Sequence, residues 1–150
     1  MNFIKRREIS SYVLVFVQFG CLAGLLYTGP LIAHKPLGKC IEIFSLLLVI
    51  WALVAMSKSK VSVFPDLKQG AILIAKGPYK FIRHPMYLAL ILFSLSVVID
   101  KPYYFRILIG LLLILNLLIK IEFEEKILIK EFKEYGNYIK VTRKLLPFIY

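Results

Sequence analysis

The sequence predicts an all-α integral membrane protein with four transmembrane helices. Apolar residues make up 59% of the chain and charged residues only 19%. A soluble domain of 150 residues has too little interior to bury that much apolar side chain. The apolar residues also gather in four runs, at residues 12–33, 40–56, 86–99 and 103–119. Each run is a candidate for one membrane crossing, and the chain is expected to form one domain over residues 1–150.

Run length supports three of the four crossings directly. A transmembrane helix needs about 20 apolar residues, and about 17 are tolerated, so the first, second and fourth runs are long enough. The third run is short, so we expect its helix either to extend back into Phe81 and Ile82 or to lie in a thin region shielded by protein. A turn of Asp100, Lys101 and Pro102 separates the third and fourth runs, because proline cannot continue a helix. These two runs are therefore predicted to form a helical hairpin.

Basic residues are unevenly distributed, and this sets the expected orientation. The N-terminal tail, the segment between the second and third runs and the C-terminal tail are rich in lysine and arginine. The two remaining turns carry only Lys35, Lys39, Lys101 and Arg106. Because basic segments stay in the cytoplasm, both termini and the middle segment are predicted to be cytoplasmic, in the cell (inner) membrane. This excess accounts for most of the +11 net charge. It favours membrane lipid as a partner and requires no nucleic acid.

The most informative stretch is residues 77–87, GPYKFIRHPMY, which abuts the third apolar run. Its dense polar, cationic and aromatic groups favour a binding site at the membrane surface over a simple anchor. Pro85 suits the first turn of a helix, where unpaired backbone N–H groups attract anions. Tyr79 and Tyr87 offer ring faces on which a purine could stack. Taken alone, His84 could instead be an interfacial side chain with a satisfied ring.

A second constellation, KIEFEE, follows the fourth run at residues 120–125. Lys120 and Glu124 are four residues apart and share a helix face. One interpretation is a surface salt bridge, although the acid-before-base order suits Glu122 with Lys126 better. The other is that the Glu124 carboxylate holds a cation, such as a sulfonium or an α-ammonium. Glu125 points about 100° further round the helix and is expected to matter less.

Spaced aromatic and apolar residues mark the C-terminal segment: Phe132, Tyr135, Tyr138, Leu145, Leu146, Pro147 and Phe148. With interleaved lysines they predict an amphipathic helix that lies on the membrane and closes over the site. An amphipathic tail without that role fits the pattern equally well. Cys21 and Cys40 have no CxxC spacing and no neighbouring histidine cluster, so no metal site is expected.

Together these motifs resemble the isoprenylcysteine carboxyl methyltransferase family. Its members are integral membrane enzymes that use S-adenosylmethionine and are related to phospholipid N-methyltransferases. The family pattern is Gly-x-Tyr, Arg-His-Pro-x-Tyr, a helical hairpin, a Glu-Glu pair, a leucine and spaced aromatics that end near a proline. The resemblance covers residues 64–147. The matching residues are Gly77, Tyr79, Arg83, His84, Pro85, Met86, Tyr87, Glu124, Glu125, Leu128, Phe132, Tyr135, Tyr138 and Pro147.

The resemblance implies a cytoplasmic cofactor-binding segment and two catalytic residues. By the family pattern, S-adenosylmethionine contacts Ala71, Ile72, Leu73, Ile74, Tyr79, His84, Pro85, Met86, Tyr87 and Glu124. Lys120 stands where the family has an arginine that holds the substrate carboxylate, so Lys120 and Glu124 are the implied catalytic pair. Lysine keeps the charge of arginine but loses its bidentate fork. Ala71 stands where the family often has a polar residue, so only its backbone is left to contact the cofactor.

The function implied by the resemblance is methyl transfer to a lipophilic small molecule. The first expectation is a carboxylate of a prenylcysteine-like or other lipid-like acceptor, and the alternative acceptor is a phospholipid amine. Related membrane sterol reductases, which use a nicotinamide dinucleotide phosphate, carry a similar Arg-His-Pro-x-Tyr segment but are typically longer. A small four-helix transporter would need an ionisable residue inside a helix, and the first apolar run has none.

Overall fold

The computed structural model describes residues 2–57 and 73–147, with side chains from residue 11 onward. Its helices are α1 (Asn2–Tyr27), α2 (Pro36–Met56), the 3-10 helix η1 (Gly77–Lys80), α3 (Pro85–Asp100), α4 (Tyr104–Glu131) and α5 (Tyr135–Val141). The described residues form no β-strand, only an isolated parallel bridge between Ile82 and Arg143. The all-α prediction is therefore confirmed for this part of the chain.

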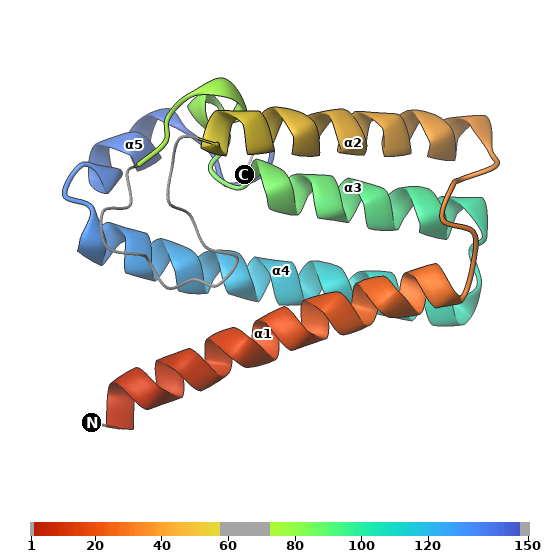
Figure 1. The fold of residues 1–150 in the computed structure, drawn as a ribbon, viewed down its shortest axis with the longest axis horizontal. Coiled ribbons are helices and arrows are strands. Elements are labelled where there is room, and N and C mark those ends of the chain that lie inside the picture. Colours follow the sequence, from red (N-terminus) through yellow and green to blue (C-terminus); the bar gives the residue numbers. More distant parts are fainter. Residues whose placement is uncertain (1, 58–72, 148–150) are drawn as a thin grey trace.

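Four long helices lie along the length of the molecule (Figure 1). α2 packs beside α3, α4 packs on the hairpin partner α3, and α1 runs obliquely along α4. η1 and α5 lie at one end of this bundle, where α2 and α4 end and α3 begins. We call this the motif end, because it holds residues 77–87, 120–125 and 135–144. The opposite end, here the far end, holds the turns at residues 28–35 and 101–103.

Prolines set where two of these helices begin. Pro36 and Pro85 lie in the first turns of α2 and α3, where the missing N–H costs no hydrogen bond and the fixed φ suits a helix. Because proline also disfavours the helical conformation in the residue before it, α3 starts at Pro85. Of the two alternatives expected for the short third run, the extension back to Phe81 and Ile82 is wrong: Phe81 ends η1, and Ile82 pairs with the C-terminal segment.

Two of the described helices are long and apolar enough to cross a membrane, α2 with 21 residues and α4 with 28. The apolar part of α1 (Ser11–Tyr27) and the whole of α3 are shorter. Only 17% of the most apolar stretch of α2, and 39% of that of α4, is buried. Large side chains such as Phe44, Leu47 and Trp51 instead face outward. A helix in the core of a soluble protein is mostly buried, so this outward apolar surface fits a lipid environment.

A narrow apolar core joins α1 to the α3–α4 hairpin. Its fully packed members are Cys21, Leu25, Val97, Leu113 and Leu117. They come from three helices, so their burial fixes which sides of α1, α3 and α4 face one another. The inward side of α4 continues toward the motif end with Lys120 and Ile121, both almost fully buried. The core thus determines that a charged residue of the acidic constellation faces the interior.

At the far end, Asp100 closes the turn between α1 and α2. Its carboxylate accepts hydrogen bonds from the backbone amides of His34, at 2.6 Å, and Lys35, at 2.7 Å. The His34 ring lies 3.5 Å from the same carboxylate and is largely exposed. Backbone donors at the start of α2 are thereby paired with a negative charge, as the positive end of a helix favours. His34 is a surface residue.

Arg106 closes the same end from the other side. Arg106 is only 1% exposed. Its guanidinium donates to the carbonyls of Lys101, at 3.4 Å, and Leu25, at 3.5 Å. Leu25 lies in the last turn of α1, where a positive charge is favoured by the helix dipole. Gly29 leaves room for this side chain, since a Cβ there would meet the guanidinium at 2.6 Å. Arg106 therefore holds the end of α1 against the start of α4.

Candidate functional site

Backbone pairing with the C-terminal segment holds the Arg-His-Pro motif in place. The amides of Arg83 and His84 donate to the carbonyls of Arg143, at 2.7 Å, and Lys144, at 3.0 Å. The amide of Arg143 in turn donates to the carbonyl of Phe81 at 3.1 Å. Two segments far apart in the sequence are thus joined side by side at the motif end (Figure 1). This pairing fixes the backbone from which the Arg83 and His84 side chains reach α4.

Arg83 and Glu125 form a buried ion pair between the motif and α4. The guanidinium Nε lies 2.6 Å from the Glu125 Oε1 atom, and the two side chains are 6% and 9% exposed. Arg83 also donates to the carbonyl of Thr142 at 2.7 Å. Such additional hydrogen bonds are needed to offset the cost of removing both charges from water. Glu125 is thereby committed to Arg83, whereas Glu124 has other partners.

His84 lies between the two carboxylates. Its Nε2 atom is 3.3 Å from Glu125 Oε1, and its Nδ1 atom is 3.8 Å from Glu124 Oε2. The ring stacks on that of Tyr87, with centroids 5.5 Å apart and planes 6° from parallel. The His84 ring is buried and satisfied, but by the acidic constellation rather than by solvent. The structure therefore brings the two constellations into contact. The prediction that both lie on the same side of the membrane allowed such a contact.

Glu124 faces the motif and is the more open of the two carboxylates. The Tyr87 hydroxyl donates a hydrogen bond to it, and its side chain is 16% exposed against 9% for Glu125. Glu124 lies about 20 residues from the start of α4 at Tyr104, which is the length of helix that crosses a bilayer. A negative charge in this partly dry setting attracts cations more strongly than one in water. The arrangement suits a carboxylate that meets a positively charged ligand.

Lys120 and Glu124 share a helix face and interact electrostatically, but no ion pair joins them. The Lys120 ammonium donates to the side-chain oxygen of Gln18 in α1 at 3.0 Å and lies 5.2 Å from the centre of the Tyr87 ring. Lys120 is 1% exposed, and no ion pair links it to a carboxylate among the described residues. The surface salt bridge with Glu124 is therefore absent. Glu122 likewise pairs with Lys144 rather than with Lys126.

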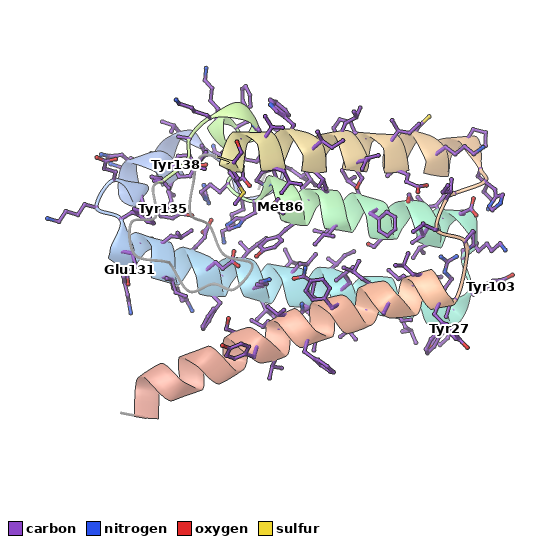
Figure 2. All side chains as sticks on the ribbon, viewed as in Figure 1. Tyr27, Met86, Tyr103, Glu131, Tyr135 and Tyr138 are labelled. Atoms are coloured by element: carbon purple, nitrogen blue, oxygen red, sulfur yellow. The ribbon has the colours of Figure 1, made fainter. Side chains whose placement is uncertain are left out.

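Three tyrosines pack at the motif end where α5 meets α4 and η1. The Tyr138 hydroxyl donates to the carbonyl of Tyr79 at 2.5 Å, and burial raises the pKa of Tyr138 to about 12. The Tyr135 ring packs against that of Tyr138, with centroids 5.7 Å apart. Tyr135 and Tyr138 both lie between α5 and the end of α4 (Figure 2). The short α5 thus covers the cluster with its buried tyrosine face, and its length of seven residues is modest for a membrane-lying helix.

The remaining residues of the predicted site divide into three groups. Pro85 and Met86 open α3, with Pro85 buried and Met86 half-buried beside the cluster (Figure 2). Leu73 and Ile74 lie half-buried in the stretch that leads into η1. Ala71 and Ile72 lie outside the described residues. The structure therefore groups Tyr79, His84, Pro85, Met86, Tyr87, Lys120 and Glu124 at or beside the motif end.

Sequence reasoning gave too little weight to two important side chains. Glu125, which was expected to matter less than Glu124, binds Arg83 and contacts His84. The backbone bridge turns Arg83 and His84 toward both carboxylates, and local helix geometry gives no sign of this. Gln18 is an amide inside the apolar part of α1. A polar group inside a membrane-spanning stretch is a signal of a buried partner, and that signal could have identified it.

The two main pockets of the described residues do not open onto the carboxylate cluster. One lies at the far end, lined by residues 30–34 and Lys39. The other is a groove between α2 and α3, lined by residues that include Ser45, Val49 and Phe93. At the motif end the charged side chains instead contact one another across the space between α3 and α4. A ligand there would have to replace some of these mutual contacts.

A comparison with protein families identifies the wider group. The sequence model of the phospholipid methyltransferase family matches residues 34–135, more than half of the chain. The chain belongs to the phospholipid methyltransferase family. This confirms the predicted kinship with membrane methyltransferases related to phospholipid N-methyltransferases, and it indicates a membrane methyltransferase. A comparison with curated proteins finds no match.

The matched range contains some of the residues that build the site and leaves others out. It runs from His34 to Tyr135, so it includes α2, η1, α3, α4 and both motif constellations. α1, most of α5 and the segment that pairs with Arg83 and His84 lie outside it. The contact between Gln18 and Lys120 therefore includes a residue outside the matched range, and the family match gives no support for it.

Proposed function

We propose that this protein transfers a methyl group from S-adenosylmethionine to a lipid-borne acceptor at the cytoplasmic surface of the cell (inner) membrane. The observation that carries the proposal is the position of Glu124. Its carboxylate is held by the Tyr87 hydroxyl beside the His84 ring, near the membrane surface, and no lysine or arginine of the described residues pairs with it. The family match to phospholipid methyltransferases supports the same reaction class.

The residues present suit S-adenosylmethionine. Glu124 would hold its positive charge, and the stacked rings of His84 and Tyr87 would provide a face for adenine. The backbone of Leu73 and Ile74, together with Tyr79, would border the nucleoside. When bound, the cofactor supplies an electrophilic methyl group on a sulfonium. The protein's part is then to position two partners and to exclude water, and α5 with its buried tyrosines covers the site from outside.

For the acceptor we propose a carboxylate on a prenylcysteine-like or other lipid-like molecule. Lys120 carries a buried positive charge without a carboxylate partner among the described residues, so it is the natural complement of an anionic acceptor. A carboxylate nucleophile carries no proton that must be removed, and Lys120 would hold it next to the Tyr87 ring. In this site Lys120 orients the acceptor and Glu124 faces the cofactor.

A phospholipid amine is the second candidate acceptor, favoured by the description of the matched family. An amine must lose its proton before it can act as a nucleophile. Among the described residues Glu124 is the carboxylate best placed to attract the ammonium form, because Glu125 is committed to Arg83. Lys120 would then face the lipid phosphate instead of a carboxylate.

Binding of the cofactor tests the proposal. We expect isothermal titration of the detergent-solubilised protein to show saturable binding of S-adenosylmethionine, and Glu124→Gln to weaken it at least tenfold. A charge-assisted contact in a partly dry site contributes about 1.5–3 kcal/mol, which accounts for that loss. Glu122→Gln is the matched control, since Glu122 lies on the same helix but is exposed and pairs with Lys144. An affinity unchanged in Glu124→Gln, or no binding to the wild type, would contradict the proposal.

A further inference from the structure

The side chain of Gln18 meets Lys120 in the apolar interior, one helical turn below the carboxylate cluster. Lys120 precedes Glu124 by four residues, which is about 6 Å along α4. Both Gln18 and Lys120 are buried, with 6% and 1% of their surface exposed. An amide buried in an apolar helix is costly unless it is hydrogen-bonded. Here the Gln18 oxygen accepts from the Lys120 ammonium at 3.0 Å, so each polar group offsets the cost of the other.

Without Gln18, the nearest opposite charge to Lys120 would be Glu124. The two residues are at i and i+4, the spacing at which side chains of opposite charge pair on a helix. In the dry interior such a pair is strongly favoured over two separate charges. Yet the two charges, which interact electrostatically, form no ion pair: the Lys120 ammonium donates to Gln18 in α1, and the Glu124 carboxylate accepts from Tyr87. Something must hold the ammonium back from the carboxylate.

The ring of Tyr87 lies between the two charges and serves both. Its hydroxyl donates to Glu124, while its face is 5.2 Å from the Lys120 ammonium. A cation over an aromatic face gains modest stabilisation, but Tyr87 reaches Glu124 as well and cannot by itself decide where Lys120 goes. Of the contacts that Lys120 makes, the hydrogen bond that it donates to Gln18 is the one that draws the ammonium toward α1. That contact comes from a helix outside the region matched by the family.

We propose that Gln18 is a positioning residue that keeps the Lys120 ammonium away from Glu124, so that both charges stay free for the reactants. The inference rests on the proposed function, in which Glu124 meets the sulfonium and Lys120 meets the acceptor. Loss of the amide lets Lys120 swing to Glu124 and neutralise it. The cofactor then has to displace an internal ion pair before it reaches the carboxylate.

Replacing Gln18 by an apolar residue of equal length tests the inference through cofactor affinity alone, so no acceptor has to be known. We expect Gln18→Met to weaken S-adenosylmethionine binding on the order of tenfold, the effect of competing with a charge-assisted contact. The decisive measurement is the double variant Gln18→Met with Lys120→Met. Removal of the competing ammonium should restore the affinity to within about twofold of the Lys120→Met single variant. A purely structural role for Gln18 would give no such rescue.

Two further variants control for packing. Asn116→Leu removes another polar contact between α4 and α1, the hydrogen bond from Asn116 to the Leu14 carbonyl at 3.1 Å, and should leave cofactor affinity unchanged. Gln18→Glu keeps an oxygen acceptor for Lys120 and should bind the cofactor like wild type. Binding by wild type with no loss in Gln18→Met, or loss without rescue, would overturn this inference alone. Failure of the wild type itself to bind the cofactor would overturn the proposed function and this inference with it.

Discussion

The two ends of the helix bundle both bury charged groups, but they satisfy them in different ways. At the far end, the Asp100 carboxylate is bound by backbone amides and the Arg106 guanidinium by backbone carbonyls. At the motif end, Glu124 and Glu125 are bound by the side chains of His84, Tyr87 and Arg83. Backbone groups belong to the fold itself, whereas side chains can change partners by rotation.

This difference indicates what each end does. A charge bound by the backbone of a turn cannot exchange partners without unfolding that turn. The charges at the far end therefore stabilise the fold. A charge held among side chains can pass to a ligand at a smaller cost, because only rotamers have to change. At the motif end the two carboxylates also lie on consecutive residues of one helix. Their repulsion destabilises the fold, so a purely structural role gives no reason to place them together. The comparison therefore supports a stabilising role for the far end and the proposed binding role for the motif end.

The largest expected effect concerns membrane topology, that is, which side of the membrane each end of the bundle occupies. We predict four membrane crossings with both termini in the cytoplasm, so reporter fusions after Ile99 and after Tyr150 should lie on opposite sides. A reporter that is active on only one side gives an all-or-none signal. Signals from the same side would place the two ends in one compartment and remove the basis for the cytoplasmic site.

The next effect is a loss of stability at the far end. Asp100→Ala leaves the amides of His34 and Lys35 without their charged acceptor, and we expect about 3 kcal/mol of the unfolding free energy to be lost. Thermal unfolding in one detergent measures it. Cofactor affinity below the melting temperature should stay within twofold of wild type. The matched control is Lys35→Ala, which removes only an exposed contact to the Ile99 carbonyl and should cost under about 0.5 kcal/mol. A large loss of affinity in Asp100→Ala would break the division between the ends.

The opposite pattern is expected at the motif end. His84→Ala and Tyr87→Ala should each weaken S-adenosylmethionine binding by about 1–3 kcal/mol, since each removes a directional contact from a desolvated site. Tyr87→Phe separates the two contributions of that residue, because it keeps the ring that stacks on His84 and loses the hydroxyl that binds Glu124. Titration calorimetry measures all three variants. Wild-type affinity in both alanine variants would locate the cofactor elsewhere.

The smallest effect distinguishes two tyrosines within the motif end. The Tyr138 hydroxyl donates to the Tyr79 carbonyl, whereas the buried Tyr135 hydroxyl has no hydrogen-bond partner among the described residues. Tyr138→Phe should therefore cost about 1 kcal/mol, and Tyr135→Phe should leave stability unchanged or raise it slightly. Unfolding of the ligand-free protein provides the comparison. A greater loss in Tyr135→Phe than in Tyr138→Phe would contradict the assignment of these contacts.

The sequence allowed much of the fold to be predicted, because hydrophobic runs and prolines act locally. The four apolar runs correspond to α1, α2, α3 and α4. A turn after Asp100 joins α3 to α4, so the two helices form a hairpin as expected. Pro85 opens α3, as expected of a proline in a first helical turn, and this excludes the alternative in which the helix extends back to Phe81 and Ile82. Local signals of this kind determine where helices lie and say less about which of their faces meet.

The meeting of the two constellations could be predicted from the sequence, but most of their contacts could not. Residue types singled out residues 77–87 and 120–125, and the distribution of basic residues predicted that both lie on one side of the membrane. The Lys120 ammonium goes to Gln18, more than a hundred residues away in sequence, and no spacing rule anticipates such a partner. Glu125 joins the cluster because the Ile82–Arg143 bridge orients Arg83 toward it. These contacts depend on tertiary packing, which helix periodicity does not encode.

The Ile82–Arg143 bridge also bears on how the protein is made. Residues 143 and 144 leave the ribosome after every helix in the described part of the chain, and translation adds about 5–20 residues per second. The helices can therefore enter the membrane while the Arg83 and His84 backbone still lacks its pairing partners. Assembly of the site becomes a late step, separate in time from insertion. A nascent chain that ends before Arg143 would lack both backbone acceptors, so its Arg83 and His84 backbone would not yet be held in place.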